Sequence, residues 1–250
     1  MTSVRTPDPV AWSPLGSALL DFHHGETSAE LTVTSDLWED EATPVSSFYR
    51  PAGHPLPDLH SQALALCRGR VLDLGAGAGR HALELQSAGH EVVAIDVLPE
   101  AVEIMRDRGV IDARCGDITA VGKDRFDTVI MLMHGIGVVG DIHGLGLLLE
   151  RLPTILRPGG RLICDSADLA AVLEQESPAL LDELTAPDRY LGEVTFGLRY
   201  GDLTGPDYPW LFVDPDRLAI IAGAAGFGVE VVARGDRGSF LAVLEQTPAG

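Results

Sequence analysis

The stretch VLDLGAGAG, from Val71 to Gly79, decides the fold. Its first four residues form an apolar run of strand length. The alternate glycines that follow let the backbone turn sharply and approach a ligand without a Cβ in the way. RHALELQSAG comes next and is typical of a helix that ends in glycine. A strand, a glycine turn and a helix in this order predict a ligand-binding loop at the carboxyl edge of a sheet.

Strands and helices alternate after this loop. EVVAID, ARCGDI, FDTVIMLM and RPGGRLICDS predict strands, with helices over PEAVEIMRDRG and from Asp141 to Leu156. Further on, EVTFGLRY predicts a strand, DPDRLAIIAGAAG a helix, and VEVVAR and SFLAVLEQ two strands joined by a short turn. The pattern predicts an α/β fold: a Rossmann-like, seven-stranded, mostly parallel sheet with an antiparallel C-terminal strand and helices on both faces.

The first 55 residues lack this regularity. We expect them to form an N-terminal extension (1–55) ahead of one main domain (56–250). Within the extension, the pattern favours a short helix from Pro14 to His24 and a brief strand or hairpin arm from Glu30 to Thr34. Prolines then predict a helix that runs from Pro55 to about Cys67.

Composition excludes several classes of partner. The formal charge of −19 should repel a polyanion, so no nucleic acid partner is expected. No apolar run approaches the roughly 20 residues that span a bilayer, and no signal peptide is recognisable, so no membrane partner is expected. Cys67, Cys115 and Cys164 are far apart and indicate reduced, mostly buried thiols in a cytoplasmic protein. No histidine pair has a convincing metal-ligand spacing, so no metal is expected.

The spacing of the loop separates it from the dinucleotide fingerprint. That fingerprint would place its third glycine at position 80, where this chain has Arg80. Asp73, at the end of the strand, would also oppose a pyrophosphate at the helix N-terminus and suits a cationic ligand. The alternative for Asp73 is a carboxylate that accepts hydrogen bonds from loop amides.

Two more acids follow at the ends of the next strands. Asp96 ends AID, and a carboxylate there can accept hydrogen bonds from both hydroxyls of a ribose. Asp117, in CGDI, can accept from an adenine amino group while Ile118 packs near the ring. The alternative for Asp117 is a helix-capping aspartate. Together the acids indicate a nucleoside ligand.

The motifs VLDLGAGAG, AIDV, CGDI, FDTVIMLMHG and LRPGGRLI, which cover about residues 68–165, resemble class I S-adenosylmethionine-dependent methyltransferases. The resemblance implies S-adenosylmethionine as cofactor. It implies that the loop Gly75, Ala76, Gly77 and Gly79 contacts the methionine portion, that Asp96 binds the ribose, that Asp117 and Ile118 hold the adenine, and that Met133 adds backbone contacts. Asp73 and Val97 are expected in the same cofactor site. The segment FYRP resembles the lid of such enzymes, so Arg50 is expected to pair with the methionine carboxylate and Tyr49 to line the pocket.

His134 is the candidate catalytic base. It directly follows the strand FDTVIMLM, at the edge of the sheet where open α/β folds bind ligands. Histidine exchanges protons near neutral pH, and methyl transfer needs a base when the acceptor loses a proton early. The alternative is a histidine that only shapes the pocket.

Aromatic residues gather around 186–212, where GDLTGPDYPW interrupts the rhythm. We expect a substrate-selecting insertion there, with Tyr200, Tyr208 and Trp210 against a flat or apolar small molecule. The alternative is that aromatic residues simply favour strands.

The expected function is methyl transfer to a small-molecule acceptor, such as an aromatic specialised metabolite, in a monomer or homodimer. N-, O- and C-methylation all stay open. The other hypotheses are a methyltransferase for a peptide or protein, a non-catalytic cofactor-binding regulatory protein and, last because of Asp73 and Arg80, an NAD-dependent oxidoreductase.

Overall fold

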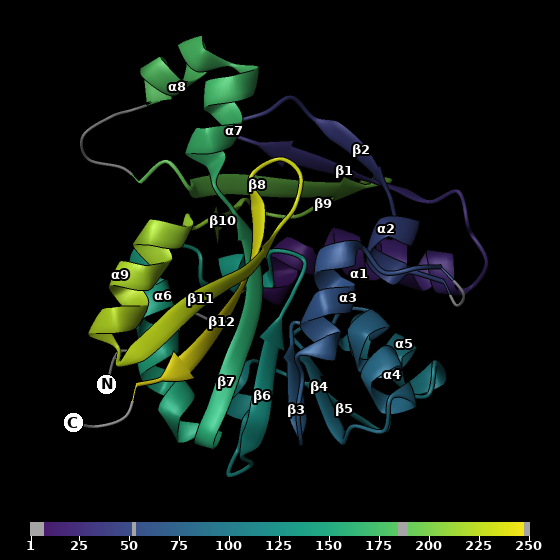
Figure 1. Ribbon diagram of the computed structural model, residues 1–250. Helices are drawn as coiled ribbons and strands as arrows, with labels where there is room; N and C mark the ends of the chain where they lie inside the picture. Colours follow the sequence, from purple (N-terminus) through teal and green to yellow (C-terminus); the bar gives the residue numbers. More distant parts are fainter. Residues whose placement is uncertain (1–7, 52–53, 185–189, 248–250) are drawn as a thin grey trace.

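A seven-stranded sheet forms the centre of the protein, in a computed structural model that describes residues 8–51, 54–184 and 190–247 (Figure 1). Its strand order is β11-β12-β7-β6-β3-β4-β5. The strands are β3 (Val71–Leu74), β4 (Val92–Asp96), β5 (Asp112–Cys115), β6 (Phe126–Met131), β7 (Leu156–Ala167), β11 (Phe227–Arg234) and β12 (Ser239–Gln246). Strands β3 to β7 pair in parallel, whereas β12 is antiparallel to both β7 and β11. The predicted sheet is confirmed.

Helices cover both faces of this sheet, as the alternating pattern predicts. One face carries α3 (Asp58–Ala65), α4 (Arg80–Ser87) and α5 (Pro99–Asp107), whose apolar side chains share one core cluster with β3 and β4. The other face carries α6 (Ile142–Arg151) and α9 (Pro215–Ala224), in a second cluster. Each cluster removes apolar surface from water and fixes the sheet edge that the functional site uses.

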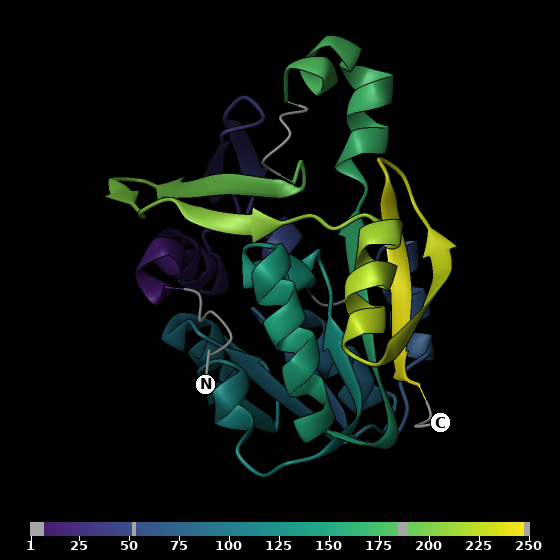
Figure 2. The same cartoon turned by 90° about the vertical axis from the view of Figure 1, so that its left-hand side faces the viewer.

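A second, smaller sheet lies across the carboxyl ends of the parallel strands (Figure 2). Its order is β10-β8-β1-β2, with β9 paired to β8. The strands are β1 (Glu30–Ser35), β2 (Glu41–Pro44), β8 (Glu193–Tyr200), β9 (Leu203–Thr204) and β10 (Tyr208–Leu211). Because β1 pairs with β8, the N-terminal extension and the aromatic-rich insertion form one sheet rather than two separate additions.

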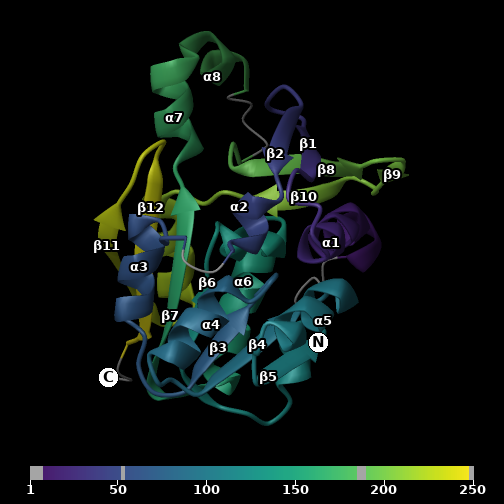
Figure 3. The ribbon, with the colours of Figure 1, turned by 90° about the vertical axis from the view of Figure 1, so that its right-hand side faces the viewer.

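The N-terminal helix α1 (Pro9–His23) packs against this second sheet and against α5 (Figure 3). It is longer than the predicted helix from Pro14 to His24. Asp8 caps the helix by accepting a hydrogen bond from the Val10 amide, and Pro14 lies inside it. Pro14 has no amide hydrogen to donate to the Val10 carbonyl oxygen, and the Ser13 hydroxyl donates to that oxygen instead at 2.9 Å, so the helix continues through the proline.

Other boundaries also differ from the predicted ones. The helix expected from Asp141 to Leu156 ends at Arg151, and a 3-10 turn (Leu152–Thr154) precedes β7. Pro153 in that turn has no amide hydrogen to continue an α-helix. The helices α2 (Ser46–Tyr49), α7 (Leu169–Glu176) and α8 (Pro178–Leu184) complete the chain. Parts of the expected extension (1–7 and 52–53) and insertion (186–189) lie outside the described residues.

Gly137 joins the second sheet to the central one. It lies in the 3-10 helix that follows β6 (Gly135–Val139), and a Cβ at this position would lie 2.6 Å from the Leu211 carbonyl oxygen of β10 and 2.3 Å from the indole nitrogen of Trp210. We expect Gly137→Ala to lower the free energy of unfolding by about 1–3 kcal/mol, as overpacking does.

Gly146 in α6 offers a matched control, because a Cβ there would meet no atom within 4 Å. Gly146→Ala should raise stability by roughly 0.5–1 kcal/mol, the usual gain in a helix interior. Chemical denaturation of both variants measures the two effects. Equal stabilities would mean that β10 does not pack against residues 135–139 as described.

Candidate functional site

A cavity of about 310 Å³ lies between the two sheets. Its floor is the carboxyl edge of β3, β4 and β6, and its roof is α1 with the second sheet. The floor contains these residues predicted for the cofactor: Gly75, Ala76, Gly77, Asp96, Val97, Asp117, Ile118 and Met133. His134, Tyr208 and Trp210 also line the cavity. The predicted residues therefore meet at one place, although they come from five separate segments.

The loop after β3 has the backbone that its glycines predict. Gly75, Gly77 and Gly79 have φ values of 81°, 53° and 79°, in the region that only glycine adopts readily. A Cβ on Gly79 would come within 2.9 Å of Met105 and Val110 of the α5 region. Gly79 is outside the cavity lining, in contrast to the prediction, because it packs the loop against its neighbours instead.

Asp96 fixes the loop from the neighbouring strand. One of its oxygens accepts a hydrogen bond from the Gly77 amide at 2.8 Å, and the other accepts from the Leu98 amide at 2.9 Å. Burial raises the pKa of this carboxyl above its usual value, while the amides act in the opposite direction. Carboxylate oxygens have further lone pairs, so Asp96 can still accept from a ligand hydroxyl in the cavity.

Asp117 caps a short helix and also lines the cavity. Its side chain accepts a hydrogen bond from the Thr119 amide at 2.8 Å and so caps the short 3-10 helix (Ile118–Val121). The same residue and Ile118 line the cavity. The cap holds this end of the cavity in one conformation.

Asp73 differs from the prediction, because it lies beneath the loop and not in the cavity. It is almost fully buried, and the Ala82 amide of α4 donates a hydrogen bond to it. One oxygen has no partner within the described residues. Burial, with the nearby charge of Asp96, raises the pKa of Asp73 to about 7. The alternative role as an acceptor for backbone amides is the one that the structure supports.

Asp73 should make stability fall as pH rises. An unfolded chain holds this carboxyl at its ordinary pKa of 3.8, so between about pH 4 and pH 7 the folded protein binds more protons than the unfolded chain. Asp73→Asn removes this titration. Relative to wild type, the variant should gain roughly 2 kcal/mol between pH 5 and pH 8. Denaturant unfolding at both pH values checks this, and an equal difference at the two would contradict a buried carboxyl with a raised pKa.

Arg80 lines the cavity and was not predicted to do so. Its exposed fraction is 7%, one of its terminal nitrogens donates to the Ser47 carbonyl oxygen at 3.0 Å, and its Nε has no partner within the described residues. Burial lowers its pKa, and so do the neighbouring charges of Arg50 and Arg108. Three close guanidinium groups beside a cavity favour an anionic ligand group. A charged side chain directly after the glycine loop was the available signal in the sequence.

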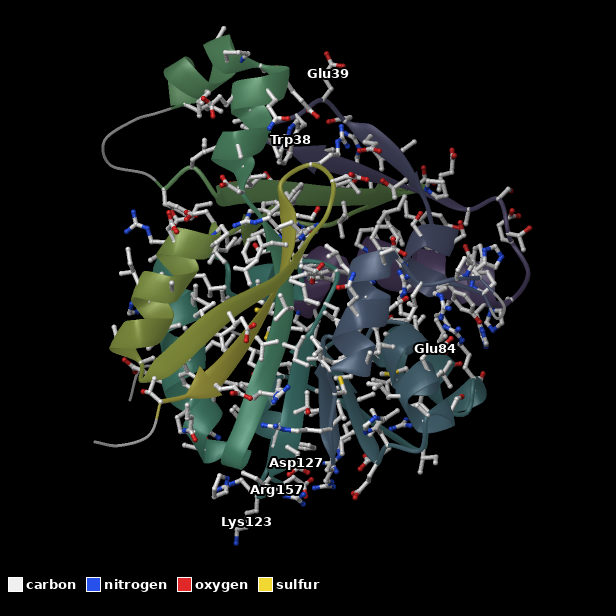
Figure 4. All side chains as sticks on the ribbon, viewed as in Figure 1. Trp38, Glu39, Glu84, Lys123, Asp127 and Arg157 are labelled. Atoms are coloured by element: carbon white, nitrogen blue, oxygen red, sulfur yellow. The ribbon has the colours of Figure 1, made fainter. Side chains whose placement is uncertain are left out.

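Arg50 does not occupy the place predicted for it. Its guanidinium forms an ion pair with Glu84 at 2.9 Å and lies outside the cavity lining (Figure 4 labels Glu84). Tyr49 also lies outside, with its hydroxyl 2.7 Å from His23 Nδ1 and its ring beneath the guanidinium of Arg108. Phe48 is the residue of this segment that lines the cavity. An isolated helical turn places adjacent side chains on different sides, and the sequence alone does not say which one faces inward.

His134 and Met133 have backbone conformations that are rare outside glycine. Their φ values are 55° and 63°. Such strain persists only where the surroundings impose it, and it concentrates at functional sites. The His134 amide donates to Asp165 Oδ1 at 2.9 Å, which helps to hold this turn. Burial lowers the pKa of the imidazole, against the opposing effect of Asp165, so the ring is neutral near pH 7 and is able to accept a proton.

An aromatic wall faces His134 from the second sheet and α1. We use this name for Trp12, Phe196, Tyr208, Trp210 and Phe212, all of which line the cavity. The Phe212 ring lies 5.5 Å from the His134 ring, and Trp12 lies 4.6 Å from Tyr208, in each case between ring centroids. Tyr200 is not part of the wall, in contrast to the prediction, because its hydroxyl donates to Asp21 at 2.8 Å. Alternation along β8 places Tyr200 and Phe196 on one face, and the strand end carries Tyr200 past the cavity.

Two further findings concern the described residues as a whole. Among them, no helix is both long and apolar enough to cross a bilayer, and no three histidine, cysteine or acidic residues are grouped as metal ligands would be. Cys164 is buried, as expected. Cys115 is exposed, so the expectation of a buried thiol was wrong for Cys115.

Comparison with protein families matches residues 71–160 to a methyltransferase domain. Among solved structures, the chain resembles an S-adenosylmethionine-dependent methyltransferase from Bacteroides fragilis that was crystallised with S-adenosyl-L-homocysteine. The two are 35% identical with a TM-score of 0.84, and the match covers 98% of this chain and 100% of the other.

Two curated proteins match shorter parts of the chain. The ubiquinone biosynthesis O-methyltransferase of Xanthomonas euvesicatoria is 29% identical over 57% of this chain and 60% of its own length. The magnesium-protoporphyrin O-methyltransferase of Rhodobacter capsulatus is 33% identical over 25% of this chain and 31% of its own length. The chain therefore spans less than two thirds of either protein.

Proposed function

Since this chain belongs to the S-adenosylmethionine-dependent methyltransferases and uses that cofactor, we propose that it methylates a small, flat, apolar molecule at an oxygen. One observation carries the proposal: His134, neutral near pH 7, lies between the cofactor loop and the aromatic wall. A base in that position suits an acceptor that loses a proton when it is methylated, as a hydroxyl does.

The proposed cofactor site uses the floor of the cavity. Asp96 would accept hydrogen bonds from the ribose hydroxyls, and Asp117 with Ile118 would hold the adenine. Arg80 would bind the methionine carboxylate, in place of Arg50, because its guanidinium faces the cavity and has no acidic partner among the described residues. The cavity fits this cofactor chemically: it offers acids for the nucleoside hydroxyls and amine, and a cation for the carboxylate.

The proposed acceptor site lies under the aromatic wall. Aromatic rings stack against flat apolar molecules, which supports an aromatic acceptor such as a specialised metabolite. The two curated relatives named above are O-methyltransferases, which supports oxygen as the methylated atom. A cavity of about 310 Å³ beneath α1 and the second sheet also favours a small molecule over a protein segment.

The chain's own residues would do three things during transfer. The cavity floor and the aromatic wall hold cofactor and acceptor in line, and such alignment can contribute up to roughly 7–11 kcal/mol. His134 Nε2 takes the acceptor proton. The roof excludes water, and we propose that the N-terminal extension (1–55) acts as the lid over residues 56–250 for this purpose.

A turnover screen tests the proposal. The full chain is incubated with S-adenosylmethionine labelled in its methyl group, together with phenols such as catechol and 3,4-dihydroxybenzoate or with the corresponding anilines. Transfer to the phenols, with little transfer to the anilines, is the expected result. Preferred transfer to the anilines would overturn oxygen as the acceptor atom. A mixture of peptides is included as a third class of acceptor, and transfer only to the peptides would overturn the small-molecule class.

A further inference from the structure

A row of buried polar side chains leads away from His134 into the core. Asp165, at the end of β7, is 3% exposed and lies between two imidazoles. Its Oδ2 atom is 3.9 Å from His134 Nδ1 and 3.5 Å from His60 Nε2. His60 Nδ1 in turn lies 3.2 Å from His81 Nε2. The four residues come from the turn after β6 and from β7, α3 and α4, so the fold brings them together over a long stretch of sequence.

Within the described residues, the basic side chains found beside the Asp165 carboxylate are imidazoles alone. The ion pairs found for this carboxylate are with His60 and His134, and no arginine or lysine is among them. A buried carboxylate is costly without a cationic partner. It therefore stabilises any proton that an adjacent imidazole takes up.

Hydrogen-bond roles along the row follow from the chemistry of a neutral imidazole, which has one donor and one acceptor nitrogen. We assign the Nε2 proton of His60 to the side that faces Asp165 Oδ2, 3.5 Å away, which leaves its Nδ1 as the acceptor that faces His81 Nε2. His81 is 4% exposed, and its pKa is well below the usual value because it is buried near His60 and Arg80. A neutral His81 suits the role of a fixed donor at the end of the row.

The two ring nitrogens of His134 have different surroundings, one on the side of Asp165 and the other on the side of the cavity. Nδ1 is buried and has no hydrogen-bond partner within the described residues, and Asp165 Oδ2 is the carboxylate oxygen on that side. Nε2 is then the nitrogen available to a molecule in the cavity. Hydrogen bonds of catalytic pairs are often long in unliganded enzymes and shorten when substrate binds.

We propose that Asp165 is the positioning residue for His134, and that His60 and His81 hold Asp165 in place. The carboxylate would fix His134 as the Nδ1–H tautomer, with the Nε2 lone pair directed to the acceptor. This assignment rests on the proposed function, because it gives the base of that reaction its orientation.

Proton transfer to His134 and methyl transfer to the acceptor oxygen then take place in one step. The acceptor O–H bond breaks and its proton passes to His134 Nε2, while an oxygen lone pair forms the new bond to the methyl carbon. The carbon–sulfur bond breaks, and its electron pair stays on sulfur, which leaves as a neutral thioether. The imidazolium faces the Asp165 carboxylate until it releases the proton to solvent.

Two ionisable groups shift the pKa of His134: Asp165 on β7 raises it and His60 on α3 lowers it. His81 and Arg80 on α4 line the same cavity as His134. Phe212, which follows β10, faces it with an uncharged ring. Removing the Asp165 charge should therefore make His134 harder to protonate, since the other three groups are neutral or cationic.

Nitrogen-15 NMR of the histidine rings tests this in the full chain saturated with S-adenosylhomocysteine. In wild type, His134 should be the Nδ1–H tautomer. In Asp165→Asn, its titration should move to lower pH, while that of His143, exposed on α6, stays in place. Asp127→Asn is the matched control, because Asp127 lies at the opposite end of β6 beside Arg157 (Figure 4) and should leave His134 unchanged.

The outcomes separate the two proposals. An Nε2–H tautomer of His134 in the wild-type protein would overturn the assignment of Asp165. This test needs no variant, so it can be made even if Asp165→Asn fails to fold. An unchanged His134 titration in a folded Asp165→Asn overturns it as well. Methyl transfer to carbon or nitrogen in the turnover screen would instead overturn the proposed function. The tautomer of His134 is measured independently of that screen.

Discussion

Replacing His134 with Asn should lower kcat by about 10²–10⁴-fold, the range that general acid–base catalysis supplies. Asn is the appropriate substitution because it tolerates the left-handed backbone, with a φ of 55°, that His134 adopts. Its amide cannot accept a proton at neutral pH. Affinity for S-adenosylhomocysteine should be unchanged, because the cofactor contacts lie on the loop and on Asp96 and Asp117.

The pH profile gives this prediction a second readout. Burial lowers the pKa of His134 below 6.5, its ordinary value, so the neutral base persists into mildly acidic solution. In wild type, kcat should therefore fall only as pH drops through that lowered pKa, below pH 6.5. In His134→Asn this fall should be absent. A wild-type kcat that persists in His134→Asn, measured where chemistry limits the rate, would show that His134 only shapes the pocket.

Replacing Arg80 with Gln should weaken S-adenosylhomocysteine binding by roughly 10- to 100-fold, which corresponds to the loss of one charge-assisted hydrogen bond of about 1.5–3 kcal/mol. The guanidinium lies in the cavity lining beside the charges of Arg50 and Arg108. A ligand carboxylate there would relieve their mutual repulsion. Calorimetric titration measures the change.

Two controls make this prediction specific. 5′-Methylthioadenosine lacks the amino acid portion of the cofactor, so its affinity should be the same for wild type and Arg80→Gln. Arg50→Gln is the matched variant, since Arg50 pairs with Glu84 outside the cavity lining and its loss should leave S-adenosylhomocysteine binding nearly unchanged. A large effect of Arg50→Gln with none of Arg80→Gln would restore the assignment expected from the lid motif.

The floor of the site could be predicted from the sequence because its determinants are local. Asp96 is the last residue of β4 and Asp117 lies two residues after the end of β5, and parallel strands bring their carboxyl ends to one edge of the sheet. Gly75 and Gly77 have positive φ values, a backbone conformation that the glycines themselves indicate in the sequence. The prediction for Asp73 was wrong because successive strand residues point to opposite sides, and Asp73, two positions before Gly75, lies beneath the loop and not in the cavity.

The roof could not be predicted in the same way. Pairing of β1 with β8 joins Thr32 to Arg199, and alternation along each strand does not name its partner. The patterns of β1 and β8 were recognisable as strands in the sequence, but their pairing in one sheet was not. The row from His134 through Asp165 was equally hidden, since His60 contributes to it from a helix far away in the sequence. Asp165 at the end of a strand next to β6 was the one signal available.

A crystal structure of the full chain with S-adenosylhomocysteine tests the central claim most directly. We expect the ligand sulfur between the loop 75–79 and the His134 ring, the ligand carboxylate on Arg80, and open space from the sulfur toward the aromatic wall. A sulfur that faces away from His134, with the aromatic wall closed off from it, would contradict the account.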